Sequence, residues 1–165
     1  MAAALAMCAS FLAGGSVAAW YVMPWLKTRP WPQALTPLLV VHLFRHVALQ
    51  LVSAQRFGFA ISDAGRDRIV YGDLVGFTLA LLALVAIRTE WVLWKPLVWV
   101  FVAETVVDLG SALAVGVGEN LFERASGVSW LILTFYVPVL WITIGLMVWQ
   151  LATHVRRTFD RANVS

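Results

Sequence analysis

Two apolar stretches of this 165-residue chain contain side chains whose types and spacing suit acid–base or ligand-binding chemistry. These side chains are His42, Arg45, His46 and Gln50 in the first stretch, and Glu104 and Asp108 in the second. An ionisable side chain at membrane depth costs roughly 2.5–3.5 kcal/mol on insertion scales and marks a functional site by default. Histidines and paired carboxylates are also the groups that proton relays and proton-coupled carriers use.

The polar residues of each stretch share one face if the stretch is an α-helix. From His42 to Ser53 they fall within about 140° of one another at 100° per residue. Glu104, Asp108 and Ser111 form a second narrow stripe, at intervals of four and three residues. The sequence therefore predicts two helices that each present one polar face.

The two stripes are expected to lie at matching depth. This places Arg45 opposite Glu104, and His46 or Gln50 opposite Asp108, which lies about one turn further along its helix. A buried guanidinium almost requires a carboxylate, because an uncompensated charge at such a site is strongly destabilising. We therefore predict that Arg45 pairs with Glu104 or Asp108.

Other apolar stretches add further candidates. Asp73 is expected near the outer end of the third stretch. In the fifth, polar residues recur every seven positions, which predicts a stripe facing one neighbour; these residues are Ser129, Tyr136, Thr143 and Gln150. Pro138 lies two residues after Tyr136. A proline commonly kinks a membrane helix beside a cavity. If such a cavity exists, Tyr136 would line it and its hydroxyl would complete the cluster.

Four interpretations of the cluster remain open. Arg45 and its carboxylate can form a clamp between helices, with the histidines satisfied in the core. The cluster can be a pathway for protons or a small solute. It can serve an intramembrane enzyme acting on a lipid or isoprenoid, in which His46 and a carboxylate supply acid–base catalysis and Arg45 holds an anionic headgroup. Whether the chain is an enzyme stays open, and the sequence identifies no cofactor.

The fourth interpretation is a metal or haem site. Its four candidate ligands are His42, His46, Glu104 and Asp108, which two facing helices would supply. The cation Arg45 would repel a metal at that point, so no metal is predicted. Both histidines point the same way from one helix, which excludes a haem held between them. Cys8 is the one cysteine, which excludes cysteine-based metal sites.

The elements that position these residues are five apolar helices. Apolar residues make up 61% of the chain and charged residues 13%, against roughly 45–50% and 25% in soluble domains. Each stretch approaches the length that a membrane core of about 30 Å requires of a helix. We predict an all-α integral membrane protein, a single five-helix domain over 1–165, with spans 2–23, 37–53, 70–87, 97–117 and 128–151 and a cytoplasmic tail at 154–165.

Charge asymmetry predicts the orientation. Seven lysines and arginines fall in the loops and tail on one side, against four on the other. The positive-inside rule then places the N-terminus outside and the C-terminus in the cytoplasm, and the membrane is expected to be the bacterial inner membrane. The net charge of +3 is small and lies in the loops and tail, so no nucleic-acid partner is expected.

The expected partners are the lipid bilayer and a small hydrophobic or ionic ligand. Ser10, Gly14 and Ala18 are small residues spaced by four, a pattern that lets helix backbones approach closely. Their partner helix can belong to this chain, to a second copy or to another subunit. Taken together, the sequence predicts a small membrane protein that binds or conducts a small ligand or protons; an intramembrane enzyme and an accessory subunit of a complex are the alternatives.

The chain is also rich in tryptophan, with nine residues of this type. Its five spans and the segment from Trp20 to Pro32 resemble the tryptophan-rich translocator family, which binds porphyrins and sterols. The later spans depart from that family, because the His42–His46 pattern and the Glu104–Asp108 pattern have no counterpart in its motifs. The sequence is therefore not assigned to it, and the tryptophans near the span ends indicate an aromatic belt at the headgroup layer.

Overall fold

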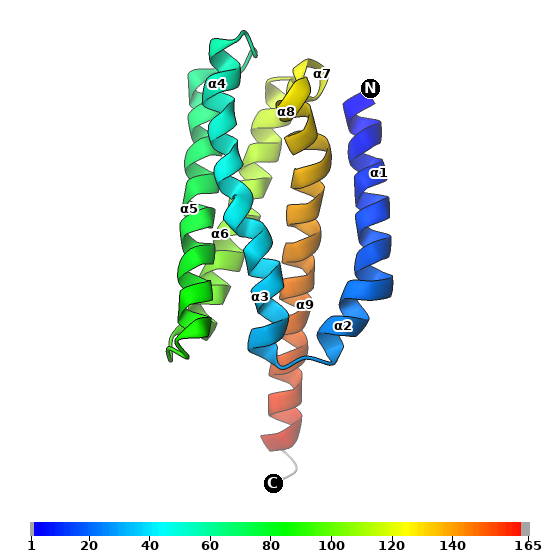
Figure 1. Ribbon diagram of the computed structural model, residues 1–165, viewed down its shortest axis with the longest axis vertical. Coiled ribbons are helices and arrows are strands. Elements are labelled where there is room, and N and C mark those ends of the chain that lie inside the picture. The colour runs from blue at the N-terminus through cyan, green and yellow to red at the C-terminus, as the bar shows by residue number, and fades with distance from the viewer. Residues whose placement is uncertain (1, 163–165) are drawn as a thin grey trace.

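The computed structural model describes residues 2–162, and the side chains of residues 2–153. The chain runs along the long axis five times, and no strand occurs among the described residues (Figure 1). Five helical passes are long and apolar enough to cross a membrane, which confirms the predicted count. The passes are Ala2–Lys27, Trp31–Arg56, Asp63–Arg88, Trp94–Gly118 and Gly127–Thr153.

Three of the passes are built from more than one helical segment. The first contains α1 (Ala2–Val17) and α2 (Met23–Lys27), and the second contains α3 (Trp31–His42) and α4 (Gln50–Arg56). The third and fourth are single helices, α5 (Asp63–Arg88) and α6 (Trp94–Gly118). The short α7 (Leu121–Arg124) precedes the fifth pass, which contains α8 (Gly127–Leu131) and α9 (Val137–Ala162).

Two helices begin earlier than the apolar spans 37–53 and 70–87 predicted. The second pass starts at Trp31, because Pro32 occupies its first turn, where a missing backbone N–H costs nothing. Pro37, which was expected at the start, lies inside α3. The third pass starts at Asp63, where the Ser62 hydroxyl accepts a hydrogen bond from the Gly65 backbone N–H at 2.9 Å. Charged residues in the first turns of α5 hid this start from a search for apolar spans.

Both π-helical segments of the described chain end two residues before a proline. Ala18–Val22 precedes Pro24, and Ile132–Tyr136 precedes Pro138. A proline has no N–H to donate, and its ring clashes with the carbonyl four residues earlier in a regular α-helix. A wider turn relieves that clash. The distortion predicted at Pro138 takes this form.

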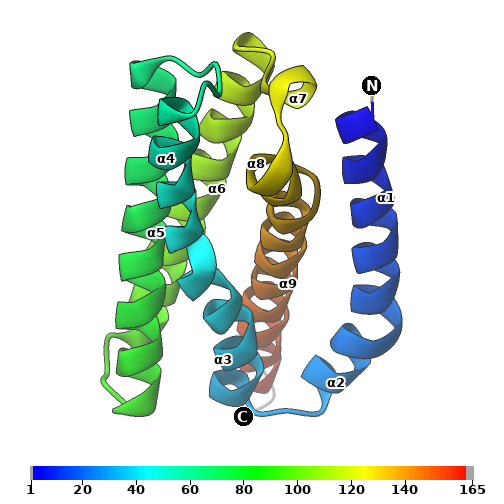
Figure 2. The ribbon, with the colours of Figure 1, turned by 45° about the horizontal axis from the view of Figure 1, so that its top comes forward.

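The core lies where α3, α5, α6 and α9 meet. Leu39, Ala83, Phe101 and Met147 are among its fully buried side chains. The first pass stands at the edge of the bundle, beside α9 (Figure 2). Gly14 packs against Ile142 of α9 so closely that an added Cβ would come within 2.7 Å of it. This part of the small-residue face thus packs within the chain, and a contact between subunits through it stays a prediction.

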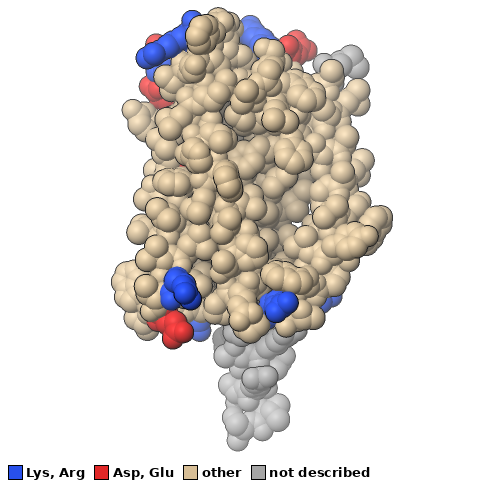
Figure 3. All heavy atoms as spheres, in the orientation of Figure 1, with Lys and Arg blue, Asp and Glu red and all other residues tan. Residues whose placement is uncertain are grey.

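The charged side chains visible on one face gather at the two ends of the bundle (Figure 3). The long middle of that face shows no lysine, arginine, aspartate or glutamate among the described residues. An uncharged belt between two charged ends is what a bilayer core between two headgroup layers requires. On this face, the charged residues of the spans are therefore hidden from view.

Candidate functional site

Arg45 lies in the middle of the second pass, in a 3₁₀ segment, Leu43–Leu49, that joins α3 to α4. Such a segment inside a longer helix often marks a functional or strained position. The Arg45 side chain is fully buried, and it is the largest fully buried side chain of the described residues. An arginine at this depth demands charged partners on the facing helices.

Three carboxylates and one hydroxyl surround the Arg45 guanidinium. Its Nε donates to Asp73 Oδ1 at 2.7 Å and its Nη2 donates to Asp108 Oδ2. Its Nη1 donates to Thr105 Oγ1 at 3.0 Å and lies 3.6 Å from Glu104 Oε2. The predicted pairing of Arg45 with Glu104 or Asp108 is confirmed, since both carboxylates lie within ion-pair distance.

Asp73 lies deeper than its expected place near the outer end of the third span. The reason is the early start of α5 at Asp63, which puts Asp73 well inside the helix and level with Arg45. Thr105 was not among the predicted site residues. Its hydroxyl also donates to Glu104 Oε2 at 3.3 Å. The sequence signal that could have found Thr105 is its position three residues before Asp108, on the same side of the helix.

Two glycines of α5 make room for the cluster. A Cβ added at Gly76 would overlap the Arg45 guanidinium, and one added at Gly72 would overlap the Asp108 carboxylate. The absence of a side chain at both positions allows the charged groups of three helices to meet. Sequence reasoning missed these glycines, although Arg68, Gly72 and Gly76 are spaced by four and share one face of α5.

The carboxylates are unequally enclosed. The Asp108 side chain is 6% exposed, while Asp73 and Glu104 are 16% and 20% exposed. Asp108 Oδ1 is buried and has no hydrogen-bond partner among the described residues. The cluster therefore contains more carboxylate oxygens than its donors satisfy.

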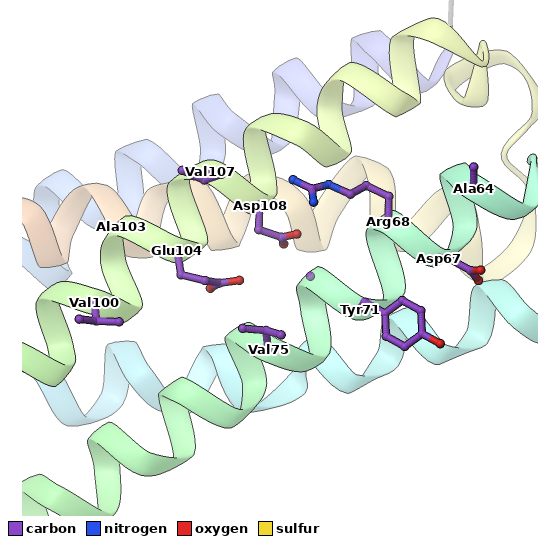
Figure 4. A pocket seen from close by; sticks show the side chains of 11 residues that line it. Ala64, Asp67, Arg68, Tyr71, Val75, Val100, Ala103, Glu104, Val107 and Asp108 are labelled. Carbon is purple, nitrogen blue, oxygen red and sulfur yellow. The ribbon is translucent and has the colours of Figure 1, made fainter.

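A surface groove between α5 and α6 opens onto the cluster (Figure 4). Its volume is about 840 Å³. Glu104 and Asp108 contribute its acidic wall, and Val75, Val100 and Val107 contribute much of its apolar wall. The groove thus brings two of the three carboxylates to a hollow on the outside of the bundle.

Arg68 stands over the end of the groove nearer the start of α5. In Figure 4 its side chain extends from α5 toward α6. Its Nε donates to Ser111 Oγ at 3.1 Å, and the Ser111 hydroxyl in turn donates to the Asp108 carbonyl at 2.9 Å. Arg68 is a second cation near Asp108 that the sequence-based cluster did not include.

His42 is a separate buried group, not a member of the Arg45 cluster. Its ring Nε2 lies 3.0 Å from Thr143 Oγ1 of α9, and its ring stands edge-on to Phe101 with centroids 5.0 Å apart. Thr143 Oγ1 also lies 2.9 Å from the Leu140 carbonyl and 3.0 Å from the Val139 carbonyl of its own helix. Nδ1 has no partner among the described residues. His42 thus occupies a sealed contact between α3 and α9.

The predicted approach of His46 or Gln50 to Asp108 is wrong. The His46 side chain is exposed on the surface of the bundle, and its Nδ1 bonds the carbonyl of Leu43 at 2.8 Å. Gln50 Oε1 accepts a hydrogen bond from Ser129 at 3.3 Å. A 3₁₀ helix turns about 120° per residue instead of 100°. The polar stripe drawn for an α-helix therefore breaks between Arg45 and Gln50.

Tyr136 also lies apart from the Arg45 cluster. Its hydroxyl donates to the Val41 carbonyl at 2.9 Å, and it does not line the groove. The predicted stripe on the fifth pass is nevertheless present, because Ser129, Tyr136 and Thr143 all contact the second pass. The stripe therefore connects the second and fifth passes. The Tyr136 hydroxyl, which was expected in the Arg45 cluster, bonds a backbone carbonyl of the second pass instead.

The four residues considered for a metal do not converge. His42 faces Thr143 and His46 faces outward, whereas Glu104 and Asp108 face Arg45. Among the side chains of residues 2–153, no group of three or more histidine, cysteine, aspartate or glutamate residues is arranged to hold a metal ion. The acidic side chains are instead grouped around a guanidinium.

Comparison with known proteins shows the family of the chain. No curated protein and no solved structure matches it. A family profile matches residues 2–152, which includes all of Arg45, Asp73, Glu104 and Asp108. The chain belongs to the family described as "Domain of unknown function (DUF8737)".

Proposed function

We propose that this protein is an integral membrane protein that binds protons at the Arg45 cluster and admits a small ligand to the same site through the groove between α5 and α6. The observation that carries the proposal is the surplus of carboxylates: three face one buried guanidinium. A clamp between helices needs one carboxylate, or two. Helix packing alone does not require the additional carboxylates, so we attribute a function to them.

The charge balance supports proton binding. With Asp73, Glu104 and Asp108 all ionised, the three carboxylates would exceed the one buried cation, Arg45, by two negative charges at membrane depth. Arg68, the second cation nearby, is exposed at the end of the groove, so much of this excess charge remains costly. Protons or a cationic group of a ligand remove that cost. The unpartnered Oδ1 of Asp108 is one place for such a proton, because no donor among the described residues stabilises a negative charge on this buried oxygen.

The groove supports access from outside the bundle. Glu104 is 20% exposed and lines the groove together with Asp108, so protons or a ligand can reach them without opening the helices. The walls on either side are apolar at Val75, Val100 and Val107, which suits a ligand with an apolar part beside its polar group. Asp73 and Arg45 do not line the groove and lie next to the two carboxylates that do.

The enzyme alternative loses its proposed acid–base pair. It required His46 beside Glu104 or Asp108, and His46 instead faces away on the surface of the 3₁₀ segment. The groove carries no serine or cysteine nucleophile among its lining residues. An accessory role in a larger complex has no specific contact in its favour.

Orientation and location belong to the same proposal. The excess of lysine and arginine at the end that carries the loops 28–30 and 89–93 supports a cytoplasmic position for that end, with the N-terminus outside. The bacterial inner membrane is the proposed location. The acidic cluster would then lie within the bilayer, with Arg68 toward its outer side.

Infrared difference spectroscopy after a pH jump tests the proposal directly, because a protonated carboxyl group has its own C=O stretching band. We expect wild-type protein in lipid vesicles to show such a band, and Glu104→Gln or Asp108→Asn to remove or shift part of it. Glu123→Gln, which changes an exposed carboxylate of the loop at α7, is the matched control and should leave the band unchanged. A wild-type protein without the band, or a band insensitive to both cluster variants, would contradict the proposal.

A further inference from the structure

A second polar hollow lies at the opposite end of the bundle from α4 and α7, where the first pass turns into the second. It has a volume of about 260 Å³ and lies between the end of α2, the start of α3 and α9. Its lining residues are Leu26, Lys27, Arg29, Trp31, Trp149, Gln150 and Thr153. None of these residues belongs to the Arg45 cluster or to its groove.

The charged groups of this hollow are all cations. Lys27 and Arg29 are exposed at its edge, and no carboxylate occurs among its lining residues. Within the described part of the chain, neither cation forms an ion pair. Lys27 Nζ lies 5.8 Å from the ring centroid of Trp149, and the Arg29 guanidinium lies 5.3 Å from that of Trp25. Aromatic faces position these cations and leave their charge uncompensated.

A buried amide in the wall provides an independent sign of a missing ligand. The Gln150 side chain is only 8% exposed and lines the hollow, yet its Nε2 has no hydrogen-bond partner among the described residues. A buried donor without an acceptor is destabilising by about 1–3 kcal/mol. An acceptor oxygen in the hollow would satisfy it after a rotation of the amide about its terminal bond.

The surroundings match the headgroup layer of a membrane. The hollow sits at the ends of three membrane-spanning passes and is lined by two tryptophans, Trp31 and Trp149. Lys95 stands close by, with Nζ 5.6 Å from the Trp31 ring. This is also the end that the charge distribution predicts to be cytoplasmic, where anionic lipids are enriched. Basic pockets between membrane helices on that side bind phosphate-containing headgroups.

We propose that this hollow binds a phosphate group, with Lys27 and Arg29 as its cationic partners and Gln150 as the buried hydrogen-bond donor. The same chemistry is offered by the headgroup of an anionic phospholipid and by free inorganic phosphate. Arg29 can hold two phosphate oxygens at once with its planar fork, while Lys27 contributes a point charge. The inference is independent of the function proposed for the Arg45 cluster.

The test measures the rise in unfolding temperature of the detergent-solubilised full chain at fixed ionic strength. Its probes are dioctanoyl phosphatidylglycerol, dioctanoyl phosphatidylcholine and sodium phosphate. We expect phosphatidylglycerol to stabilise the wild type more than phosphatidylcholine does. Stabilisation by sodium phosphate as well would identify free phosphate as a ligand, and its absence would identify the lipid headgroup.

Variants tie the binding to the hollow. Arg29→Gln should weaken binding of the stabilising probe about fivefold, the usual effect of one surface cation on an anionic headgroup. Gln150→Leu, which keeps the volume and removes the donor, should weaken it about tenfold. Arg88→Gln is the matched control, because Arg88 is an exposed cation at the same end of the bundle and does not line the hollow.

Two results would overturn the inference. One is a wild type that responds equally to phosphatidylglycerol and phosphatidylcholine and does not respond to sodium phosphate. The other is a loss of affinity in Arg88→Gln as large as that in Arg29→Gln, which would show attraction by the basic end as a whole. Because Gln150→Leu changes no charge, its effect separates a built site from general electrostatic attraction.

Discussion

His42 and Arg45 are three residues apart in the second pass, and both are fully buried, yet the protein treats them in opposite ways. His42 meets one hydroxyl, Thr143, in a contact closed by Phe101. Arg45 meets three carboxylates and a hydroxyl, and two of those carboxylates line a groove on the outside of the bundle. The His42 site holds one titratable side chain and is sealed, whereas the Arg45 site holds three carboxylates around one guanidinium and opens onto a groove.

The difference shows what distinguishes a structural polar contact from a candidate site at membrane depth. Burial and polarity are common to both positions, so neither property is diagnostic. The number of partners is informative, because packing alone does not explain two negative charges beyond the one that Arg45 neutralises. Access is informative too, because only the acidic cluster can exchange protons or a ligand with the surroundings.

Removing Arg45 should have the largest effect on this comparison. In Arg45→Met three carboxylates lose their common cation, and we expect the free energy of unfolding to fall by about 3–5 kcal/mol. Chemical unfolding in detergent, followed by tryptophan fluorescence, measures the loss. The destabilisation should shrink as the pH is lowered, because protonation neutralises the carboxylates. Full stability at neutral pH would break the contrast between the two sites.

Filling the space beside the cluster should have the next largest effect. In Gly76→Ala the new Cβ overlaps the Arg45 guanidinium, and overpacking of this kind costs about 1–3 kcal/mol. Gly110→Ala and Gly145→Ala are matched controls, because a Cβ at either position meets nothing within 4 Å. The controls should be neutral or slightly stabilising, as alanine favours helix over glycine. Equal stability of Gly76→Ala and the controls would show that the cluster is loosely packed.

Removing the partner of His42 should weaken the protein without changing proton binding. Thr143→Val leaves the buried Nε2 of His42 without its hydrogen-bond partner, and we expect a loss of about 1–2 kcal/mol in the free energy of unfolding. The infrared carboxyl band should stay as in the wild type. A change in that band in Thr143→Val would couple the two sites and remove the distinction between them.

The contact between Glu119 and Ser62 lies outside the membrane-spanning segments and adds an exposed acidic contact to the comparison. Glu119 accepts hydrogen bonds from the Ser62 backbone N–H at 2.7 Å and from the Ser62 hydroxyl at 2.5 Å. The hydrogen bonds from the Ser62 side chain and backbone lower the pKa of Glu119 below its usual value of 4.5. Its contribution to stability is complete above that value and is lost as the pH falls through the lower pKa of the folded state.

The expected effect at Glu119 is the smallest of the series. Glu119→Gln should unfold at a lower temperature than the wild type at neutral pH, and the difference should close in acid, below the pKa of the folded protein. Glu123→Gln is the control, an exposed carboxylate of the same loop region without a hydrogen bond to Ser62. A pH-independent difference between Glu119→Gln and the wild type would contradict the assigned contact.

The sequence by itself determined the five apolar passes and the pairing of Arg45 with carboxylates of the fourth pass. Hydropathy is a property of each segment alone, so it survives any arrangement of the helices. Charge neutralisation at membrane depth is nearly obligatory, so the pairing of Arg45 with Glu104 or Asp108 followed from composition and spacing. Helix starts were less predictable, because the first turns of α3 and α5 are polar or proline-rich and depend on local capping.

Only the tertiary structure decided which polar residues meet. The 3₁₀ segment turns the helix by about 140° more over its seven residues than an α-helix would, and this separates His46 and Gln50 from Arg45. Gly72 and Gly76 allow α5 to approach closely enough for Asp73 to join the cluster. Both effects depend on how neighbouring helices pack, and a periodicity computed for one isolated α-helix contains neither.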